Sequence, residues 1–236
     1  MIVAEIIAGG SGQRMGQDIP KQFLNVYNKP VLIYTLEAFQ RHPKIDAIEV
    51  VCIEGWEDVV WAYANQFKIN KLKWVTPGGK TGQESIRNGV FNMKGILSFD
   101  DLIIIHDGIR PLVEEYVLNN LIETAAKHGN AVTSLPYNEQ VFIKDPEDNT
   151  RTKKYIPRKS FRRVATPQAY QFDAVYEAYK KAFEKEIGIG PSTYTNTMMV
   201  DLGYELYFAE GSEKNIKITT VSDLELLKAY LKFKPE

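Results

Sequence analysis

The chain has 236 residues, of which 44% are hydrophobic and 25% are charged, so it can build one sizeable hydrophobic core. Its 29 basic and 30 acidic residues leave a net charge of -1, which excludes an overall positive field that would attract nucleic acid or an anionic membrane. No apolar run approaches the roughly 20 residues that span a bilayer. We expect a single domain over residues 1–236, with neither nucleic acid nor membrane as a partner.

Cysteine and histidine are scarce. Cys52 lies in the apolar run 48–53 and has no second cysteine to pair with, so we expect a buried thiol that acts as a small hydrophobic side chain. The three histidines are not in metal-ligand spacing, and the N-terminal segment becomes glycine-rich too early for a signal peptide. These features predict a cytoplasmic protein.

Short apolar runs rich in β-branched residues alternate with longer segments of helical spacing. The expected strands cover residues 2–7, 48–53, 102–106 and 131–135, and the expected helices cover residues 31–41, 57–67, 84–91 and 116–128. The strands lack the polar alternation of half-exposed strands, so both of their faces are expected to be buried. This order predicts an α/β fold of the Rossmann-like kind, a mostly parallel twisted sheet with helices on both faces. Ligands of such sheets bind beyond the carboxyl ends of the strands.

The alternation breaks at about residues 137–163. Strand-forming residues flank a turn-rich segment there, which predicts a protruding β-arm, with a flexible loop as the alternative. An isolated hairpin is barely stable in water, so we expect a homodimer that is joined through this arm. After the arm we expect a helix over 172–185, strands over 205–209 and 216–219, and a last helix whose capping box begins at Ser222.

A glycine-rich loop over residues 8–16 follows the first strand, carries Arg14 and is followed by Lys21. Glycines let backbone N–H groups approach phosphate oxygens closely. Met15 stands where the third glycine of a dinucleotide fingerprint belongs, and no Gly-Lys-Ser/Thr closes a Walker A loop. The pattern predicts a phosphate-binding loop of another kind; a tight turn with solvated basic residues is the alternative.

Asp107 and Arg110 come directly after the buried strand 102–106. A carboxylate at the end of such a strand is well placed to bind a divalent cation, and a single carboxylate suits Mg²⁺. We therefore predict a magnesium site at Asp107, with Arg110 facing the same mouth; a turn or cap residue is the alternative. For His106 we expect only a strand-end residue.

Six motifs, in order from about residue 3 to residue 230, are similar to those of the 2-C-methyl-D-erythritol 4-phosphate cytidylyltransferases and ribitol-5-phosphate cytidylyltransferases. They are residues 10–15, 20–23, 78–85, 106–111, 165–168 and 215–219. The resemblance implies a fold of the nucleotide-diphosphosugar-transferase type with an arm that clasps a second subunit. It also implies a Mg²⁺-dependent transfer of CMP from CTP to a polyol phosphate, with release of pyrophosphate.

The resemblance further implies roles for individual residues. The catalytic residues would be Arg14, Lys21 and Lys217. The CTP phosphates and cytosine would be bound by Ala8, Gly9, Gly10, Gly12, Gly79 and Ser85. The acceptor would be bound by Arg110, Thr166, Thr193 and, from the partner subunit, Arg158, while Asp107 would hold Mg²⁺.

The chemistry of such a reaction fits the residues present. A phosphomonoester has a second pKa near 6, so at neutral pH it is already a dianionic nucleophile and needs no general base. The lack of a histidine-centred triad therefore favours this hypothesis, and catalysis would depend on positioning and charge neutralisation. A nucleotide-sensing module without turnover and a nicotinamide oxidoreductase are the alternatives from other classes.

Three departures from the erythritol-phosphate pattern concern the acceptor. Glu139-Gln140 replaces Asp-Thr, Thr193-Tyr194 replaces Thr-Asp, and Lys80-Thr81-Gly82 stands where an arginine is common. The Ala8-Gly9-Gly10 loop is similar to the ribitol-phosphate branch. We expect ribitol 5-phosphate as the acceptor, in the service of a cell-surface polysaccharide, with methylerythritol phosphate of the isoprenoid pathway as the alternative.

Overall fold

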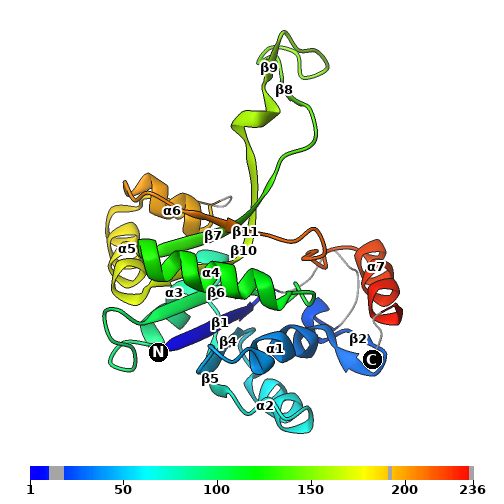
Figure 1. Ribbon diagram of the computed structural model, residues 1–236, viewed down its shortest axis with the longest axis vertical. Coiled ribbons are helices and arrows are strands. Elements are labelled where there is room, and N and C mark those ends of the chain that lie inside the picture. The colour runs from blue at the N-terminus through cyan, green and yellow to red at the C-terminus, as the bar shows by residue number, and fades with distance from the viewer. Residues whose placement is uncertain (11–18, 191–192, 234–236) are drawn as a thin grey trace.

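The computed structural model describes residues 1–10, 19–190 and 193–233. Within these residues a seven-stranded sheet forms the centre of the molecule, in the order β11-β7-β10-β6-β1-β4-β5 (Figure 1). Six strands share one direction, and β10 runs antiparallel to β6 and β7. The predicted mostly parallel sheet is confirmed. Its strands are β1 Ile2–Ala8, β4 Ala47–Cys52, β5 Leu72–Pro77, β6 Leu102–Asp107, β7 Asn130–Pro136, β10 Arg162–Gln171 and β11 Phe208–Glu210.

Helices cover both faces of the sheet. One face packs against α1 (Val31–Arg41), α2 (Glu57–Gln66) and α4 (Glu115–His128), and the other against α3 (Gly82–Asn92), α5 (Phe172–Lys185) and α6 (Thr195–Asp201). Because side chains alternate along a strand, Ala4 and Ile6 of β1 face the first group and Val3 faces the second. The central strands are thus buried on both sides, as the lack of polar alternation in their sequences predicted.

Smaller elements complete the body at the carboxyl ends of the strands. The short helix η2 (Lys21–Phe23), the strands β2 (Asn25–Val26) and β3 (Lys29–Pro30), and the last helix α7 (Val221–Lys232) lie there. A third apolar cluster, of Val26, Val31, Ile109, Ile218 and Leu227, joins them. No helix in the described part of the chain is long and apolar enough to cross a membrane.

The prediction of a strand over residues 216–219 is wrong. That segment has no regular structure, although the N–H of Ile218 donates to the carbonyl of Ile109 at 2.9 Å. The side chain of Ile218 is fully buried beside Val31 and Leu227. The apolar residues of this segment therefore serve the third cluster and not the sheet, which is why their composition resembled that of a strand.

The predicted start of the last helix is also wrong. Thr220, two residues before Ser222, caps α7. The carboxylate of Asp223 accepts from the N–H of Thr220 at 2.7 Å, and the hydroxyl of Thr220 accepts from the N–H of Asp223 at 3.3 Å. An aspartate completes this capping box in place of the expected glutamate.

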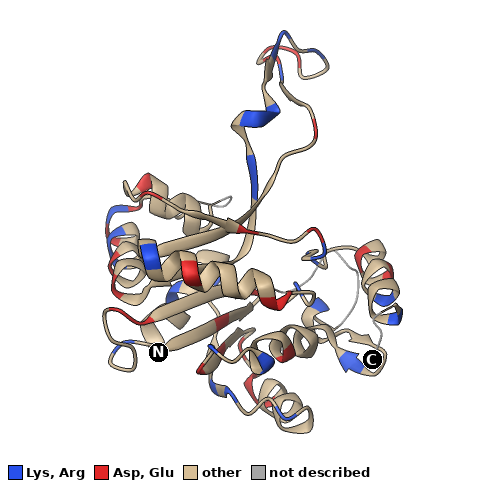
Figure 2. Ribbon diagram, viewed as in Figure 1, with Lys and Arg blue, Asp and Glu red and all other residues tan. Residues whose placement is uncertain are grey.

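The arm extends far from the body (Figure 1). It consists of β8 (Val141–Ile143), β9 (Lys154–Ile156) and the short helix η3 (Arg158–Ser160). β8 and β9 pair antiparallel, with Phe142 opposite Tyr155. Figure 2 shows basic residues along the stem of the arm, while both signs of charge mix over the body.

Candidate active site

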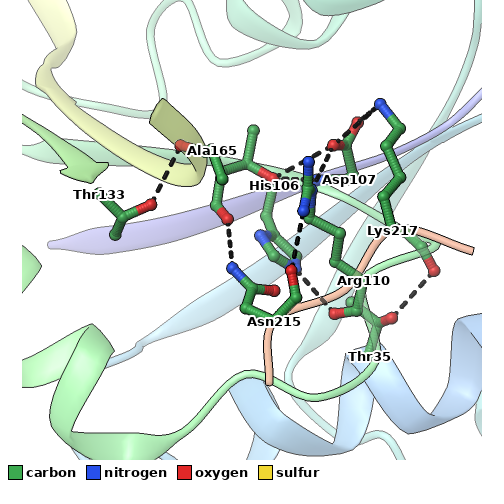
Figure 3. Close-up of polar contacts among 10 residues, drawn as sticks. Thr35, His106, Asp107, Arg110, Thr133, Ala165, Asn215 and Lys217 are labelled. Carbon is green, nitrogen blue, oxygen red and sulfur yellow. Dashed lines mark hydrogen bonds and ion pairs between the residues drawn. The ribbon is translucent and has the colours of Figure 1, made fainter. Parts of the chain in front are cut away.

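A charged cluster surrounds the carboxylate of Asp107 at the carboxyl end of β6 (Figure 3). Arg110 donates to it from Nε at 2.9 Å, and Lys217 donates from Nζ at 3.1 Å. The hydroxyl of Thr166 lies 3.3 Å from the carboxylate and accepts from the N–H of Asp107 at 3.1 Å. Four residues that are far apart in the sequence are thus brought together, and all four are ones that the sequence had singled out.

The two cations decide the charge of Asp107. Burial would raise the pKa of its carboxyl, but the Lys217 ammonium and the Arg110 guanidinium outweigh burial and lower this pKa to about 2. Asp107 is therefore a permanent anion at neutral pH and not a proton carrier. Its side chain remains 23% exposed, so its oxygens can be reached from outside. With two cations around one anion, the cluster has an excess positive charge that suits a phosphate.

His106 plays a structural part behind this cluster. The side chain is fully buried, its ring packs against Phe39 with centroids 5.2 Å apart, and Nε2 lies 3.0 Å from the carbonyl of Arg110. Because a carbonyl only accepts, Nε2 carries the hydrogen. Burial lowers the pKa of His106 to about 4, so the ring is neutral at physiological pH. The geometry agrees with the strand-end residue that the sequence predicted.

Asn215 links two residues of the cluster, and sequence reasoning gave it no role of its own. Its carbonyl accepts from Nη1 of Arg110 at 2.8 Å, and its side-chain amide donates to the carbonyl of Thr166 at 2.7 Å. The residue is buried, and its Oδ1 has no partner among the described residues. It lies in one of the predicted motifs, but motif membership alone did not indicate this bridging contact.

A glycine-lined recess lies beside the cluster, at the ends of β1 and β5. The N–H of Gly79 donates to the hydroxyl of Ser85 at 3.0 Å, and that hydroxyl donates to the carbonyl of Thr81 at 2.9 Å. A Cβ at Gly9 would lie 3.1 Å from Oγ of Ser85, and one at Gly79 would lie 2.3 Å from Cβ of Glu84. Side chains at these two positions would crowd α3 and force the recess, whose cavity measures about 440 Å³, to rearrange.

Gln22 holds the entrance of the glycine-rich loop, which is a second contact that the sequence did not reveal. Its buried side chain donates to the carbonyl of Ala8 at 2.6 Å and to that of Gly10 at 3.1 Å. Lys21 is its neighbour on η2 and is half-buried. Gly12 and Arg14, both expected at the phosphates, lie outside the described residues.

The sheet register brings the recess and the charged cluster next to each other. Ile7 of β1 lies opposite Asp107 of β6, and Ala8 lies opposite Cys52 of β4. The N–H of Gly78, just after β5, donates to the carbonyl of Cys52 at 2.7 Å. With neighbouring strands about 4.8 Å apart, the distance across β6, β1, β4 and β5 is about 14 Å. A ligand of nucleotide size can therefore contact both ends.

A cavity of about 310 Å³ opens behind the cluster, between the sheet and the first turn of α6. Asp107, Arg110, Thr166 and Lys217 line it, together with Ile7, Ile86, Ile105, His106, Val164, Ala165, Gln168, Tyr194, Thr195 and Asn196. A second cavity of about 360 Å³ shares Arg110 and Lys217 with the first and extends toward the base of the arm. The cluster is thus open to ligands from more than one side.

Two of the expected acceptor residues are not part of this assembly. The hydroxyl of Thr193 donates to the carbonyl of Gly190 at 2.7 Å, and Thr193 does not line the cavity, although Tyr194 and Thr195 do. Arg158 lies on the arm, where Nη1 donates to the carbonyl of Asn138 at 3.2 Å. Within one chain, neither side chain reaches the charged cluster.

A glycine-lined recess beside a cluster of cations, at the carboxyl edge of a mostly parallel sheet, is typical of a site that binds phosphorylated ligands such as nucleotides. The chain belongs to the family described as 2-C-methyl-D-erythritol 4-phosphate cytidylyltransferase, which matches residues 2–233. The expected family, fold and class of enzyme are therefore confirmed.

Relatives from two branches of this family cover the whole chain. The chain is 56% identical over 234 residues to a ribitol-5-phosphate cytidylyltransferase of Lacticaseibacillus paracasei, with 99% of each chain covered. It is 34% identical to a 2-C-methyl-D-erythritol 4-phosphate cytidylyltransferase of Syntrophus aciditrophicus, over 98% of this chain and 96% of the relative. The solved 4-diphosphocytidyl-2C-methyl-D-erythritol synthase of Anaerococcus prevotii matches with a TM-score of 0.81, at 25% identity over 98% of each chain.

Proposed function

We propose that the protein transfers CMP from CTP to D-ribitol 5-phosphate and releases pyrophosphate, and that it supplies CDP-ribitol for a cell-surface polysaccharide. The observation that carries this proposal is the cluster of Asp107, Arg110 and Lys217 beside the glycine-lined recess. The choice of acceptor rests on the higher identity to the ribitol-phosphate relative, 56% against 34%. Methylerythritol phosphate remains the second candidate, because one fold serves both acceptors in this family.

The reaction needs charge neutralisation more than proton transfer. An oxygen of the acceptor phosphate attacks the α-phosphorus of CTP and forms the new P–O bond. The bond from the α-phosphorus to the bridging oxygen breaks, and pyrophosphate leaves with the electron pair. Arg110 and Lys217 would stabilise the anionic charge on both reactants, and Asp107 would hold these two cations in place. Such preorganised charge is commonly the largest contribution to catalysis.

Mg²⁺ is part of the proposal, with Asp107 as its protein ligand. Among the described residues no group of three or more His, Cys, Asp or Glu side chains could hold a metal ion by itself. Mg²⁺ is commonly bound by one or two carboxylates together with substrate phosphates and water. The anionic, partly exposed carboxylate of Asp107 suits this mode of coordination. When bound, the ion would neutralise charge on the triphosphate.

We also propose a cytoplasmic homodimer in which the arm of each subunit completes the neighbour's site. Phe142, Ile143 and Tyr155 of the arm are 56%, 44% and 70% exposed in the single chain, and a partner subunit would cover them. Residues 137–163 hold eight basic and four acidic residues, so the arm would add positive charge, including Arg158, to a site for anionic substrates. The buried Cys52 is compatible with a reducing compartment.

The proposal is tested by measuring pyrophosphate release from CTP with a panel of acceptors: ribitol 5-phosphate, methylerythritol phosphate and glycerol 3-phosphate. We expect the highest kcat/KM with ribitol 5-phosphate, loss of activity with EDTA, and recovery with Mg²⁺. A higher kcat/KM with methylerythritol phosphate would select the second candidate. Absence of pyrophosphate with every acceptor, while CTP still binds, would indicate a nucleotide-sensing module.

A further inference from the structure

Two buried polar side chains, Gln168 and Thr195, line the cavity behind the charged cluster and take no part in the reaction described above. Gln168 is 5% exposed and Thr195 is 2% exposed. Gln168 lies on β10, opposite Ile105 of β6, while Thr195 opens α6 on the other side of the cavity. The hydrogen bonds around each side chain decide whether it can donate to a ligand or accept from one.

The orientation of the Gln168 amide is fixed from behind. The buried hydroxyl of Tyr170 donates to its Oε1 at 2.7 Å. Burial raises the pKa of Tyr170, so this phenol stays a neutral donor. The amide nitrogen of Gln168 has no acceptor among the residues that the structure describes. This nitrogen is not among the fully buried side-chain atoms that lack a partner, and Gln168 lines the cavity, so the nitrogen is open to the cavity and available for a ligand acceptor.

A chain of three hydrogen bonds makes Thr195 an acceptor toward the cavity, whereas Gln168 is a donor. The amide nitrogen of Gln83 donates to the carbonyl of Gly188 at 3.1 Å, so its oxygen accepts from the hydroxyl of Tyr179 at 2.8 Å. The hydroxyl of Tyr179 also lies 2.7 Å from that of Thr195. Because a phenol has one hydrogen, Thr195 must be the donor in this last contact. The hydroxyl oxygen of Thr195 therefore keeps its lone pairs for a ligand donor.

We propose that Gln168 and Thr195 are specificity-determining residues that bind the hydroxyl groups of the acceptor. Gln168 donates to a hydroxyl oxygen, Thr195 accepts a hydroxyl hydrogen, and Tyr170 and Tyr179 act as positioning residues behind them. This inference rests on the proposed function and deepens it, because it names the part of the acceptor pocket that selects a hydroxylated chain.

The rest of the cavity supports a phosphorylated polyol. Its charged residues, Asp107, Arg110 and Lys217, belong to the cluster at one side, where the two cations would bind the phosphate. Ile7, Ile86 and Ile105 provide apolar contacts for a carbon chain. Apart from the residues of that cluster and the neutral His106, the described residues that line the cavity carry no ionisable side chain other than the phenol of Tyr194. A second phosphate or carboxylate on the acceptor would therefore be left unpaired.

The test compares two acceptors that share a phosphate but differ in chain length and number of hydroxyls, ribitol 5-phosphate and glycerol 3-phosphate. We expect Gln168→Met to lower the ratio of their kcat/KM values about tenfold or more, because a neutral hydrogen bond in a buried site is lost. Thr195→Val should lower the same ratio, and the KM for CTP should not change. Tyr170→Phe should reduce the ratio less, because it only releases the amide.

Asn130→Leu is the matched control. Asn130 is a buried amide that lies opposite Tyr170 in the same sheet, but both ends are already used: it donates to the carbonyl of Glu205 at 2.9 Å and accepts from the N–H of Tyr207 at 3.1 Å. Its loss should lower stability and leave the acceptor ratio unchanged. If Gln168→Met fails to fold, Gln168→Met with Tyr170→Phe removes both partners of the buried bond, which restores the balance of polar groups.

The outcomes separate this inference from the proposed function. Equal loss of kcat/KM for both acceptors in the Gln168 and Thr195 variants would overturn the inference, even when the wild-type enzyme prefers ribitol 5-phosphate. A wild-type preference for methylerythritol phosphate would contradict the proposed acceptor alone, and the ratio taken with that acceptor would then decide the inference. Direct titration of the acceptor into the enzyme without CTP gives an independent readout: the variants should bind ribitol 5-phosphate about tenfold or more weakly.

Discussion

The ion pair of Lys217 and Asp107 fixes the position of the lysine charge and adds little to the stability of the fold. The Nζ of Lys217 lies 3.1 Å from the carboxylate, and its side chain is 37% exposed. A partly exposed pair of this kind contributes little to folding. It does hold an ammonium group at the carboxyl end of β6, where the acceptor phosphate and the triphosphate of CTP would meet.

We predict that Lys217→Ala lowers kcat by about a hundredfold or more and leaves the fold intact, because the lysine stabilises charge that develops in the transition state. The matched control is Lys214→Ala, three residues earlier, which removes a pair with Glu114 on the surface. Steady-state kinetics and a thermal melt of both variants check this prediction. Equal kcat values for the two variants would remove Lys217 from the mechanism.

Gly79 has no room for a Cβ atom, whereas Gly82 does, so the two positions test whether glycine is sterically required in the recess. We predict that Gly79→Ala raises the KM for CTP about tenfold or more, because its Cβ would lie 2.3 Å from Cβ of Glu84 and force the recess to rearrange. A Cβ at Gly82 has no atom within 4 Å, so Gly82→Ala in the first turn of α3 should leave this KM unchanged and raise stability slightly. Titrations with CTP decide between the two; a KM that is insensitive to Gly79→Ala would place the nucleotide elsewhere.

The sequence predicted the residues at strand ends but not those that position them. Asp107 and Arg110 follow an unmistakable buried strand, so their location at the ligand edge followed from topology alone. Asn215 acts through a partner that only the folded chain brings close, the carbonyl of Thr166, which is 49 positions away. Periodicity and motif spacing hold no information on such long-range contacts.

At the scale of elements, β1 and β4 carry an unusual pair. Glu5 and Glu49 lie directly opposite each other and are fully buried. Glu49 accepts from the hydroxyl of Thr76 at 2.6 Å and from the amide of Asn92 at 2.8 Å, whereas Glu5 has no partner among the described residues. Burial raises the pKa of Glu5 well above its usual value, and the nearby Glu49 raises it further. Burial also raises the pKa of Glu49, to about 7, against the opposing hydrogen bonds.

This pair should make the protein less stable as pH rises. Between pH 4.5, the usual pKa of Glu49, and about 7, the folded state binds more protons than the unfolded state, so the free energy of unfolding falls with increasing pH. A shift of this size corresponds to a loss on the order of 3 kcal/mol. Glu49→Gln should remove the part of this pH dependence that is due to Glu49 and leave the part that is due to Glu5, while Glu123→Gln, on the surface beside Lys44, should leave both. Urea unfolding at several pH values between 4.5 and 8 measures the slope; a wild-type stability that rises with pH over this range would contradict the prediction.

The sequence predicted the strands whose two faces are buried. It did not predict β5, which lies at the edge of the sheet, or β10, which is irregular. β5 is an edge strand with Lys73 exposed and several half-buried residues, so its sequence lacks the apolar run of β1 or β4. β10 carries Pro167 and a register shift between Val164 and Gln168, and both features disguise a strand. That same irregularity brings Thr166 to Asp107, so the site itself explains the departure from strand-like sequence.

At the scale of the whole molecule, the arm exposes large apolar side chains and carries an excess of basic residues. Figure 1 shows it standing clear of the body. The rings of Phe142 and Tyr155 pack on each other with centroids 6.4 Å apart, and both side chains remain exposed. Three of its four acidic residues, Asp145, Glu147 and Asp148, surround Arg151 at the tip, which leaves Arg158 on the stem to face a neighbour. A twofold dimer would let each stem approach the other subunit's anionic substrates.

The last prediction is that an Arg158→Ala chain and a Lys21→Ala chain, each nearly inactive alone, complement each other when they are mixed. If Arg158 acts in the neighbouring subunit, one of the two sites in a mixed dimer has both residues intact. Statistical mixing of equal amounts would then restore about a quarter of the wild-type activity. Arg151→Ala is the control, because Arg151 forms ion pairs with acidic residues at the tip of the arm. This variant should be active without a second chain. Subunit exchange is verified with differently tagged chains. Exchange without recovered activity would place Arg158 in its own subunit's site or outside catalysis.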